Sequence, residues 1–162
     1  MENGLQYLLD RAAVSDVVLR FFEALDSFDT DAVRACLADE FTLDAGPQVT
    51  PNPEPQPVAQ FIEGLVARNW GFESTAHLNP NHLIDLDGDR ATVRANMWAS
   101  HIVGEGPQDL FVSYGKYTID LIRKGDSWRM TKLRIGAIRT EGGAAADIYK
   151  AAADRLAAGE GH

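Results

Sequence analysis

Hydrophobic residues recur at three- and four-residue spacing in the first part of the chain. Between positions 5 and 25 they form one stripe, as on an amphipathic helix, which comprises Val14, Val17, Val18, Phe21, Phe22 and Leu25. A short second helix is predicted to follow, with Thr30 as its N-cap, because a hydroxyl can accept from the free amides of the first turn. We expect the two helices to form a hairpin that turns at positions 26–29.

A proline-rich loop is expected over positions 46–57, because proline cannot donate to a regular ladder of hydrogen bonds. Pro57 suits the first turn of a third helix that ends near Asn69. The buried face of this helix is predicted to consist of Val58, Phe61, Ile62, Leu65 and Val66.

Farther along the chain the hydrophobic period shortens to two residues, as in strands. Segments 83–86 and 91–101 flank a turn at 87–89, and segments 110–123 and 128–138 flank a turn at 124–127, so each pair predicts a β-hairpin. With a short strand over 41–44, helices followed by an antiparallel meander predict an α+β fold. The alanine-rich stretch 144–158 predicts a terminal helix or a partly ordered tail.

Length and composition fit one intracellular domain. The 162 residues, 45% of them hydrophobic, can bury one core; we assign positions 1–142 to the domain and 143–162 to a C-terminal helix or tail. A net charge of -9 repels phosphate backbones and anionic lipids, so neither a nucleic acid nor a membrane is an expected partner. The lone Cys36 excludes an internal disulfide, and no spacing indicates a metal site or a nucleotide cofactor. We predict a cytoplasmic protein without a cofactor or metal.

The central strand carries the first candidate for chemistry. Alternation gives one small apolar face, predicted to point inward, which consists of Ala91, Val93, Ala95, Met97, Ala99 and His101. The alanines leave room beneath a curved sheet, and His101 projects into that space near the strand end. An imidazole there can exchange protons near neutral pH.

The face on which His77 lies depends on the preceding connection. A simple two-residue turn at Gly88-Asp89 would put His77 opposite Ser100, on the outer face. We adopt the hypothesis of a bulge near Pro80, which shifts the parity by one residue and brings His77 to the inner face beside His101. His82 is then expected to pack in the sheet.

Asp26 is the third candidate, four residues beyond Phe22 on the buried stripe of the first helix. Beside His77, its carboxylate would accept the ring N–H, fix the tautomer and leave the other nitrogen free as a general base. Each candidate also has a purely structural interpretation. Asp26 would end the first helix or cap the next, His77 would lie in an exposed loop, and His101 would be a hydrogen-bonded histidine at a strand end.

Several spaced segments resemble SnoaL-like proteins of the nuclear-transport-factor-2-like superfamily. They lie in the same order as in that family and comprise residues 14–44, Thr75-Ala-His77-Leu-Asn-Pro-Asn81, Asp87-Gly-Asp-Arg-Ala91, Ala99-Ser-His101, Gly115-Lys-Tyr117 and Trp128-Arg129. The resemblance covers roughly positions 12–138. It implies a curved antiparallel sheet, a cone-shaped half-barrel, with N-terminal helices enclosing an apolar pocket, and a homodimer or homotrimer.

Within this family the functional pattern is most similar to the scytalone dehydratase and dehydrochlorinase branch. That resemblance implies catalytic roles for Asp26, His77 and His101. In the implied pocket, the residues expected to bind the substrate are Phe22, Met97 and Tyr117.

The chain departs from both named enzymes. Two tyrosines of the dehydratase correspond to Leu25 and Ala45, and a cationic residue of the dehydrochlorinase corresponds to Leu133, although Arg134 is adjacent. Neither named substrate is therefore implied. The leading hypothesis is a cofactor-independent, dehydratase-like lyase or isomerase of a hydrophobic small molecule. The alternative is a non-catalytic small-molecule-binding or accessory protein, and a scaffold that only dimerises is a third interpretation.

Overall fold

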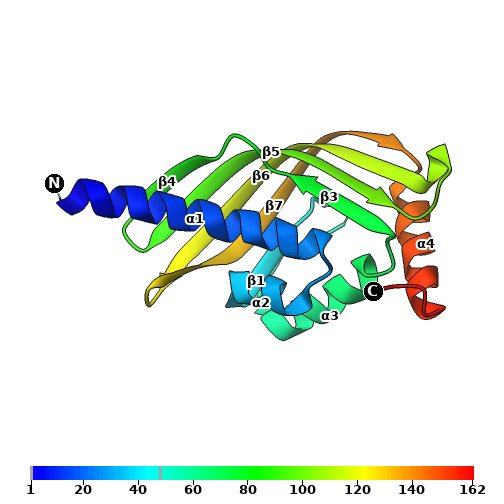
Figure 1. Cartoon of the computed structure of the whole chain (residues 1–162), viewed down its shortest axis with the longest axis horizontal. Helices are drawn as coiled ribbons and strands as arrows, with labels where there is room; N and C mark the ends of the chain where they lie inside the picture. The colour runs from blue at the N-terminus through cyan, green and yellow to red at the C-terminus, as the bar shows by residue number, and fades with distance from the viewer. Residues whose placement is uncertain (1, 48) are drawn as a thin grey trace.

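Two helices open the chain and most strands lie in its second half, which confirms the predicted α+β fold (Figure 1). The computed structural model describes residues 2–47 and 49–162. Its helices are α1 (Glu2–Asp26), α2 (Thr30–Cys36), α3 (Val58–Asn69) and α4 (Ala145–Ala157), with a 3-10 turn at Pro107–Asp109. Its strands are β1 (Leu37–Asp44), β2 (Gln56–Pro57), β3 (Ser74–Leu78), β4 (Leu83–Asp87), β5 (Arg90–Ile102), β6 (Leu110–Lys124) and β7 (Ser127–Gly142).

The sheet contains both predicted hairpins and two pairings that the pattern did not predict, those of β1 with β7 and of β1 with β2, the latter at the end of the segment expected to be a loop. In the described residues the strand order is β2-β1-β7-β6-β5-β3, and β4 also pairs with β5. The β4–β5, β5–β6 and β6–β7 pairs are antiparallel, but β1 runs parallel to β7, so the sheet is mixed and not antiparallel throughout. No tight turn joins β1 to β7, so their relative direction is free of the constraint that makes a hairpin antiparallel.

The turn between α1 and α2 lies where the sequence predicts it, but its N-cap residue differs. Asp29, not Thr30, is the N-cap of α2, because its carboxylate accepts from the amide of Ala32 at 2.9 Å. Phe28 has a φ of 55°, a left-handed conformation that redirects the chain between the helices. Both residues can cap a helix, and the backbone path decides which one does.

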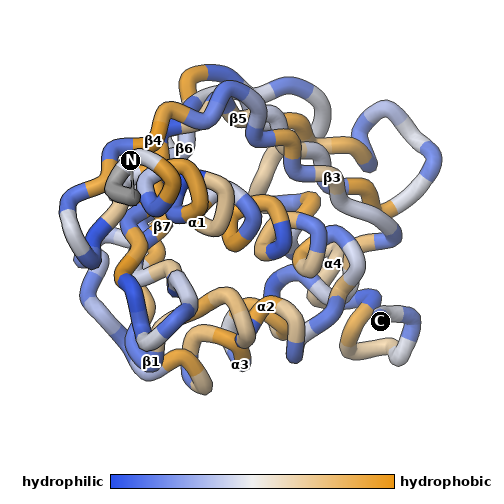
Figure 2. Tube along the Cα trace, turned by 60° about the vertical axis from the view of Figure 1, so that its left-hand side comes forward, coloured by the Kyte–Doolittle hydropathy of each residue, from blue (hydrophilic) through white to orange (hydrophobic). Residues whose placement is uncertain are grey.

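The core lies between α1 and the concave face of the sheet. The α1 stripe of Val14, Val18, Phe21 and Phe22 is at most 2% exposed. The predicted inner face of β5, from Ala91 to His101 at alternate positions, is at most 5% exposed, which confirms the assignment of faces. Figure 2 shows hydrophobic and hydrophilic positions alternating along these elements.

A register shift between β3 and β4 turns His77 inward. Leu83 pairs with Arg94, and the same register continued backward would bring His77 opposite Ser100. Instead His77 pairs with Ala99, one residue earlier. Asn81 has a φ of 64°, and the carbonyl of Pro80 accepts from the amide of Asn96 at 3.0 Å. The irregularity predicted near Pro80 is therefore present.

The alanine-rich C-terminal stretch is a helix that docks on the connection between α3 and β3. Ile148 and Ala152 of α4 are 2% and 0% exposed. A Cβ on Gly71 would lie 1.7 Å from the carbonyl oxygen of Ala152, so this close approach of two backbones requires glycine. Arg155 donates to the carbonyl of Gly71 at 3.0 Å, which fixes the helix at its far end.

Candidate active site

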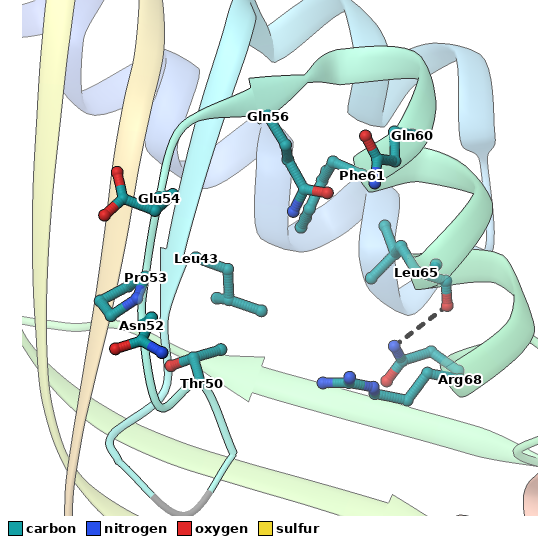
Figure 3. Close-up of a pocket in the computed structure, with 12 residues that line it drawn as sticks. Leu43, Thr50, Asn52, Pro53, Glu54, Gln56, Gln60, Phe61, Leu65 and Arg68 are labelled. Carbon is teal, nitrogen blue, oxygen red and sulfur yellow. Dashed lines mark hydrogen bonds between the residues drawn. The ribbon is translucent and has the colours of Figure 1, made fainter.

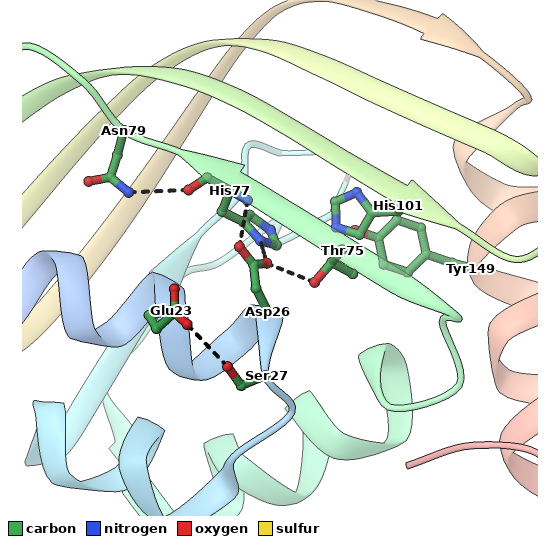
Figure 4. A network of polar contacts seen from close by, with 8 residues as sticks. All are labelled: Glu23, Asp26, Ser27, Thr75, His77, Asn79, His101 and Tyr149. Carbon is green, nitrogen blue, oxygen red and sulfur yellow. Dashed lines mark hydrogen bonds and ion pairs between the residues drawn. The ribbon is translucent and has the colours of Figure 1, made fainter.

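Asp26 and His77 meet at the end of α1, where the helix crosses β3 (Figure 4). One carboxylate oxygen lies 2.6 Å from Nδ1 of His77, and the other accepts from the backbone N–H of His77 at 2.8 Å. The hydroxyl of Thr75 donates to the first oxygen at 2.8 Å. The side chains of Asp26 and His77 are 24% and 13% exposed, so the pair is largely shielded from water.

The environment of Asp26 favours its ionised form. Burial raises the pKa of this carboxyl, but the hydrogen bonds and charge of His77, with the bond from Thr75, outweigh burial and lower it below the usual value. An ionised carboxylate only accepts hydrogen bonds, so Nδ1 of His77 carries a proton, and in the neutral form of the ring Nε2 has the free lone pair. This is the arrangement that a general base requires.

His101 lies beside the pair, on the neighbouring strand β5. The ring centroids of His77 and His101 are 5.2 Å apart and the rings are nearly perpendicular. His101 is 5% exposed, and burial, assisted by the positive charge that His77 can carry, lowers its pKa to about 3. At neutral pH this imidazole is therefore uncharged, and it can offer an N–H donor but not an imidazolium acid.

Two of the three predicted substrate-binding residues border the pair. Phe22 stacks on His77, with centroids 5.8 Å apart, and contacts Tyr117, with centroids 4.7 Å apart. Burial and the negative charge of Asp26 raise the pKa of Tyr117, so its phenol keeps its proton. Met97 is buried on the same face of β5 as His101, two alternate positions away.

Comparison with known proteins identifies the family. Residues 6–134 match the SnoaL-like domain. The chain belongs to the SnoaL-like family. This confirms the family that the sequence suggested, and the matched region contains the predicted trio Asp26, His77 and His101. No functionally curated protein matches the chain.

Solved structures share the fold across nearly the whole chain. The Kfla4162 protein from Kribbella flavida is 27% identical, with a TM-score of 0.79 over 89% of this chain and 99% of that chain. A scytalone dehydratase-like protein from Novosphingobium aromaticivorans is 19% identical, with a TM-score of 0.70 over 84% and 89%. A hexachlorocyclohexane dehydrochlorinase from Novosphingobium barchaimii is 15% identical, with a TM-score of 0.70 over 88% and 95%. At such identities the last two show the fold alone.

In this SnoaL-like chain, Arg134 does not replace the cationic residue that the dehydrochlorinase has at the position of Leu133. Leu133 faces the core at 4% exposure. Arg134 is instead 56% exposed and pairs with Asp44 at 2.9 Å, away from the core. No register slip therefore brings a cationic side chain from this part of β7 into the site.

A second polar network supports the backbone at His77. The amide group of Asn79 donates to the carbonyl of His77 at 3.3 Å, and its oxygen lies 2.9 Å from Nε2 of His82. Nδ1 of His82 lies 2.9 Å from the hydroxyl of Ser15 on α1. His82 lies one residue before β4, is half-buried and is held by Ser15 and Asn79, which is a structural role beside the sheet. It ties the irregular backbone beside His77 to the first helix.

One polar residue of the site, Tyr149, was not predicted from the sequence. Tyr149 of α4 brings its hydroxyl to 3.3 Å from Nε2 of His101, and the two rings are 5.4 Å apart (Figure 4). Its neighbour Ile148 is one of the hydrophobic residues that form the buried side of this helix. Nothing in the alanine-rich sequence indicates which strand Tyr149 faces, because that depends on how α4 docks.

Two hollows described in the structure are lined by residues other than the trio. One, of about 290 Å³, lies between α3 and the segment 50–56, where Leu43, Phe61 and Leu65 meet Arg68 and Asn52 (Figure 3). The other, of about 690 Å³, borders the sheet near Thr92, Asp120 and Lys132. Within residues 2–47 and 49–162, no group of three or more His, Cys, Asp or Glu residues is arranged to hold a metal ion. No helix in the same residues is long and apolar enough to cross a membrane.

Proposed function

We propose that this protein is a cofactor-independent, dehydratase-like lyase or isomerase that acts on a hydrophobic small molecule. The observation that carries the proposal is the 2.6 Å contact between Asp26 and Nδ1 of His77. The contact leaves Nε2 of His77 as a base in a shielded setting that includes Phe22 and Tyr117. Membership of the SnoaL-like family is consistent with this proposal, but the fold also serves unrelated functions, so the site must carry the argument.

In the proposed reaction, Nε2 of His77 removes a proton from a carbon next to an activating group. In an elimination, the electron pair of that C–H bond forms the double bond, and the leaving hydroxyl takes the proton from the His77 imidazolium and departs as water. In an isomerisation, the electron pair shifts into the activating group and the imidazolium returns its proton to another atom of the substrate. The imidazolium formed on His77 is stabilised by the carboxylate of Asp26. The neutral His101 orients the substrate or donates a hydrogen bond to its oxygen. General base catalysis of this kind contributes about 10²- to 10⁴-fold.

A solvent-exchange assay tests the proposal. The full chain is incubated in D₂O with a panel of aromatic ketones and β-hydroxyketones, and deuterium uptake and loss of water are followed by NMR. At least one compound should exchange or eliminate with the wild type, and His77→Gln should abolish this. The matched control is His162→Gln, because His162 bonds to the carbonyl of Phe72 outside the trio.

The non-catalytic alternative gives a different result in the same assay. A compound whose signals broaden or shift on binding, but whose carbon-bound protons never exchange, would indicate a binding or accessory protein and contradict the proposal. The homodimer or homotrimer and the cytoplasmic location implied above stay predictions, for which sedimentation of the full chain and localisation of a tagged copy are the tests.

A further inference from the structure

The neighbours of His101 are unusual for a buried histidine. Its Nε2 lies 3.3 Å from the hydroxyl of Tyr149, whereas its Nδ1 is fully covered and has no hydrogen-bond partner within the described part of the chain. A buried donor without a partner costs about 1–3 kcal/mol, so such groups are rare and often belong to functional sites. The question is whether this nitrogen carries the proton.

The hydrogen bond to Tyr149 indicates which ring nitrogen of His101 carries the proton. In one arrangement the phenol donates to Nε2 and the ring proton lies on Nδ1; in the other, Nε2–H donates to the phenol oxygen. A phenol is the more acidic donor and an imidazole nitrogen is the more basic acceptor, so the first arrangement forms the stronger bond. The phenol must also find an acceptor for its own proton, and Nε2 of His101 is the one at hand.

Both partners are uncharged at neutral pH, as this bond requires. Burial lowers the pKa of His101 to about 3 and raises the pKa of Tyr149 to about 12. The negative charge of Asp26 acts on His101 in the opposite direction but is outweighed by burial. The pair is therefore a neutral phenol against a neutral imidazole.

Tyr149 is held firmly in its position. Its ring contacts Phe72, with centroids 5.2 Å apart, and Phe111, with centroids 6.4 Å apart, and both of these rings also contact His101. The close approach of Gly71 to Ala152 fixes the next turn of α4. The hydroxyl thus comes from a docked helix that lies beyond residues 6–134, the region matched to the family.

We propose that Tyr149 holds His101 as the Nδ1–H tautomer, so that this N–H, which is covered in the described structure, is the hydrogen-bond donor left for an oxygen atom of a substrate that displaces the side chains over it. Tyr149 is then a positioning residue that acts through His101. The substrate part of this inference rests on the proposed function, whereas the tautomer is a property of the protein alone. It also restricts the substrate to compounds with a carbonyl or hydroxyl oxygen near the acidic carbon.

The test is the tautomer of His101 in the full chain labelled with ¹⁵N-histidine. Two-bond ¹H–¹⁵N correlation spectra distinguish a protonated ring nitrogen from a bare one, and His101→Gln identifies the signals by their loss. We expect Nδ1 protonated and Nε2 bare in the wild type. Tyr149→Phe should move His101 toward the Nε2–H form, and the exposed Tyr7→Phe should leave it unchanged. The signals of His82, held by Asn79 and Ser15, serve as an internal reference.

An Nε2–H tautomer in the wild type overturns the inference, and so does an unchanged tautomer in folded Tyr149→Phe. If that variant does not fold, the wild-type spectrum still decides. On a compound that the wild type turns over, Tyr149→Phe should lower kcat about tenfold with little change in KM, the loss expected for one neutral hydrogen bond. Absence of any turnover would refute the proposed function and leave the tautomer result standing.

Discussion

Replacing Asp26 with Asn changes the site with almost no change in volume. The carboxylate accepts from three donors, namely Nδ1 of His77, the amide of His77 and the hydroxyl of Thr75. An amide has one accepting oxygen and a donating NH₂, so in Asp26→Asn at least one of these donors faces another donor. Because the backbone amide cannot move its proton, we expect the NH₂ group to face Nδ1 of His77. The imidazole would then carry its proton on Nε2.

The structure sets the size of this effect. With Nε2 protonated, His77 is no longer a base, and the loss should approach the whole contribution of general base catalysis, about 10²- to 10⁴-fold in kcat. The loss of folding free energy should be about 1–3 kcal/mol, the worth of a hydrogen bond to a charged group, because the Asp26 side chain is only 24% exposed.

The assays are turnover, urea unfolding and the ¹⁵N tautomer of His77. The matched control is Asp39→Asn, because the side chain of Asp39 is 86% exposed and pairs with Lys124 at the surface. Should folded Asp26→Asn keep its turnover within twofold and His77 keep its Nδ1 proton, the reasoning about this pair would be refuted.

Three further predictions concern the surroundings of the pair. Burial lowers the pKa of His101 from 6.5 to about 3, so the associated stability is fully present above pH 6.5 and is lost as the pH falls toward 3. Urea unfolding of His101→Gln should therefore show a smaller loss of folding free energy between pH 6.5 and pH 3 than the wild type. An equal dependence of the folding free energy on pH in both proteins would contradict the assignment. Gly71→Ala should cost about 2 kcal/mol or more, because its Cβ meets the carbonyl of Ala152, and thermal unfolding within 1 °C or so of the wild type would show that α4 does not dock there. Asn79→Ala should lower kcat about tenfold by freeing the carbonyl of His77 and should cost about 1–3 kcal/mol of folding free energy, because Asn79 is buried and also bonds to His82; unchanged kcat in the folded variant would remove Asn79 from the positioning network.

Local signals in the sequence were sufficient for much of the fold. The three- and four-residue spacing gave α1 and its buried stripe, and strict alternation gave β5 with His101 on the inner face. The inward direction of His77 also had a local cause, because Pro80 interrupts the ladder and leaves room for a one-residue shift. Once the face of His77 was assigned, Asp26 was a natural partner from the buried side of α1.

Features that depend on contacts between distant segments could not be predicted from local patterns. The parallel pairing of β1 with β7 joins strands from opposite ends of the domain. Alternation within a strand indicates which face is buried, but it does not indicate which strand pairs with it. Tyr149 reaches His101 only because α4 packs on Gly71, and no spacing within the helix predicts that contact. The network through His82 needs the bulge, α1 and β4 together. These are tertiary contacts, decided by packing and not by local pattern.

The most direct measurement of the central claim is the exchange of a substrate's carbon-bound proton with solvent, compared between the wild type and His77→Gln at equal occupancy of the site. The account predicts exchange in the wild type, a slower reaction when that hydrogen is replaced by deuterium, and no exchange above the solution rate in folded His77→Gln. Exchange by His77→Gln at the wild-type rate would show that another group takes the proton, and would contradict the role assigned to Asp26 and His77.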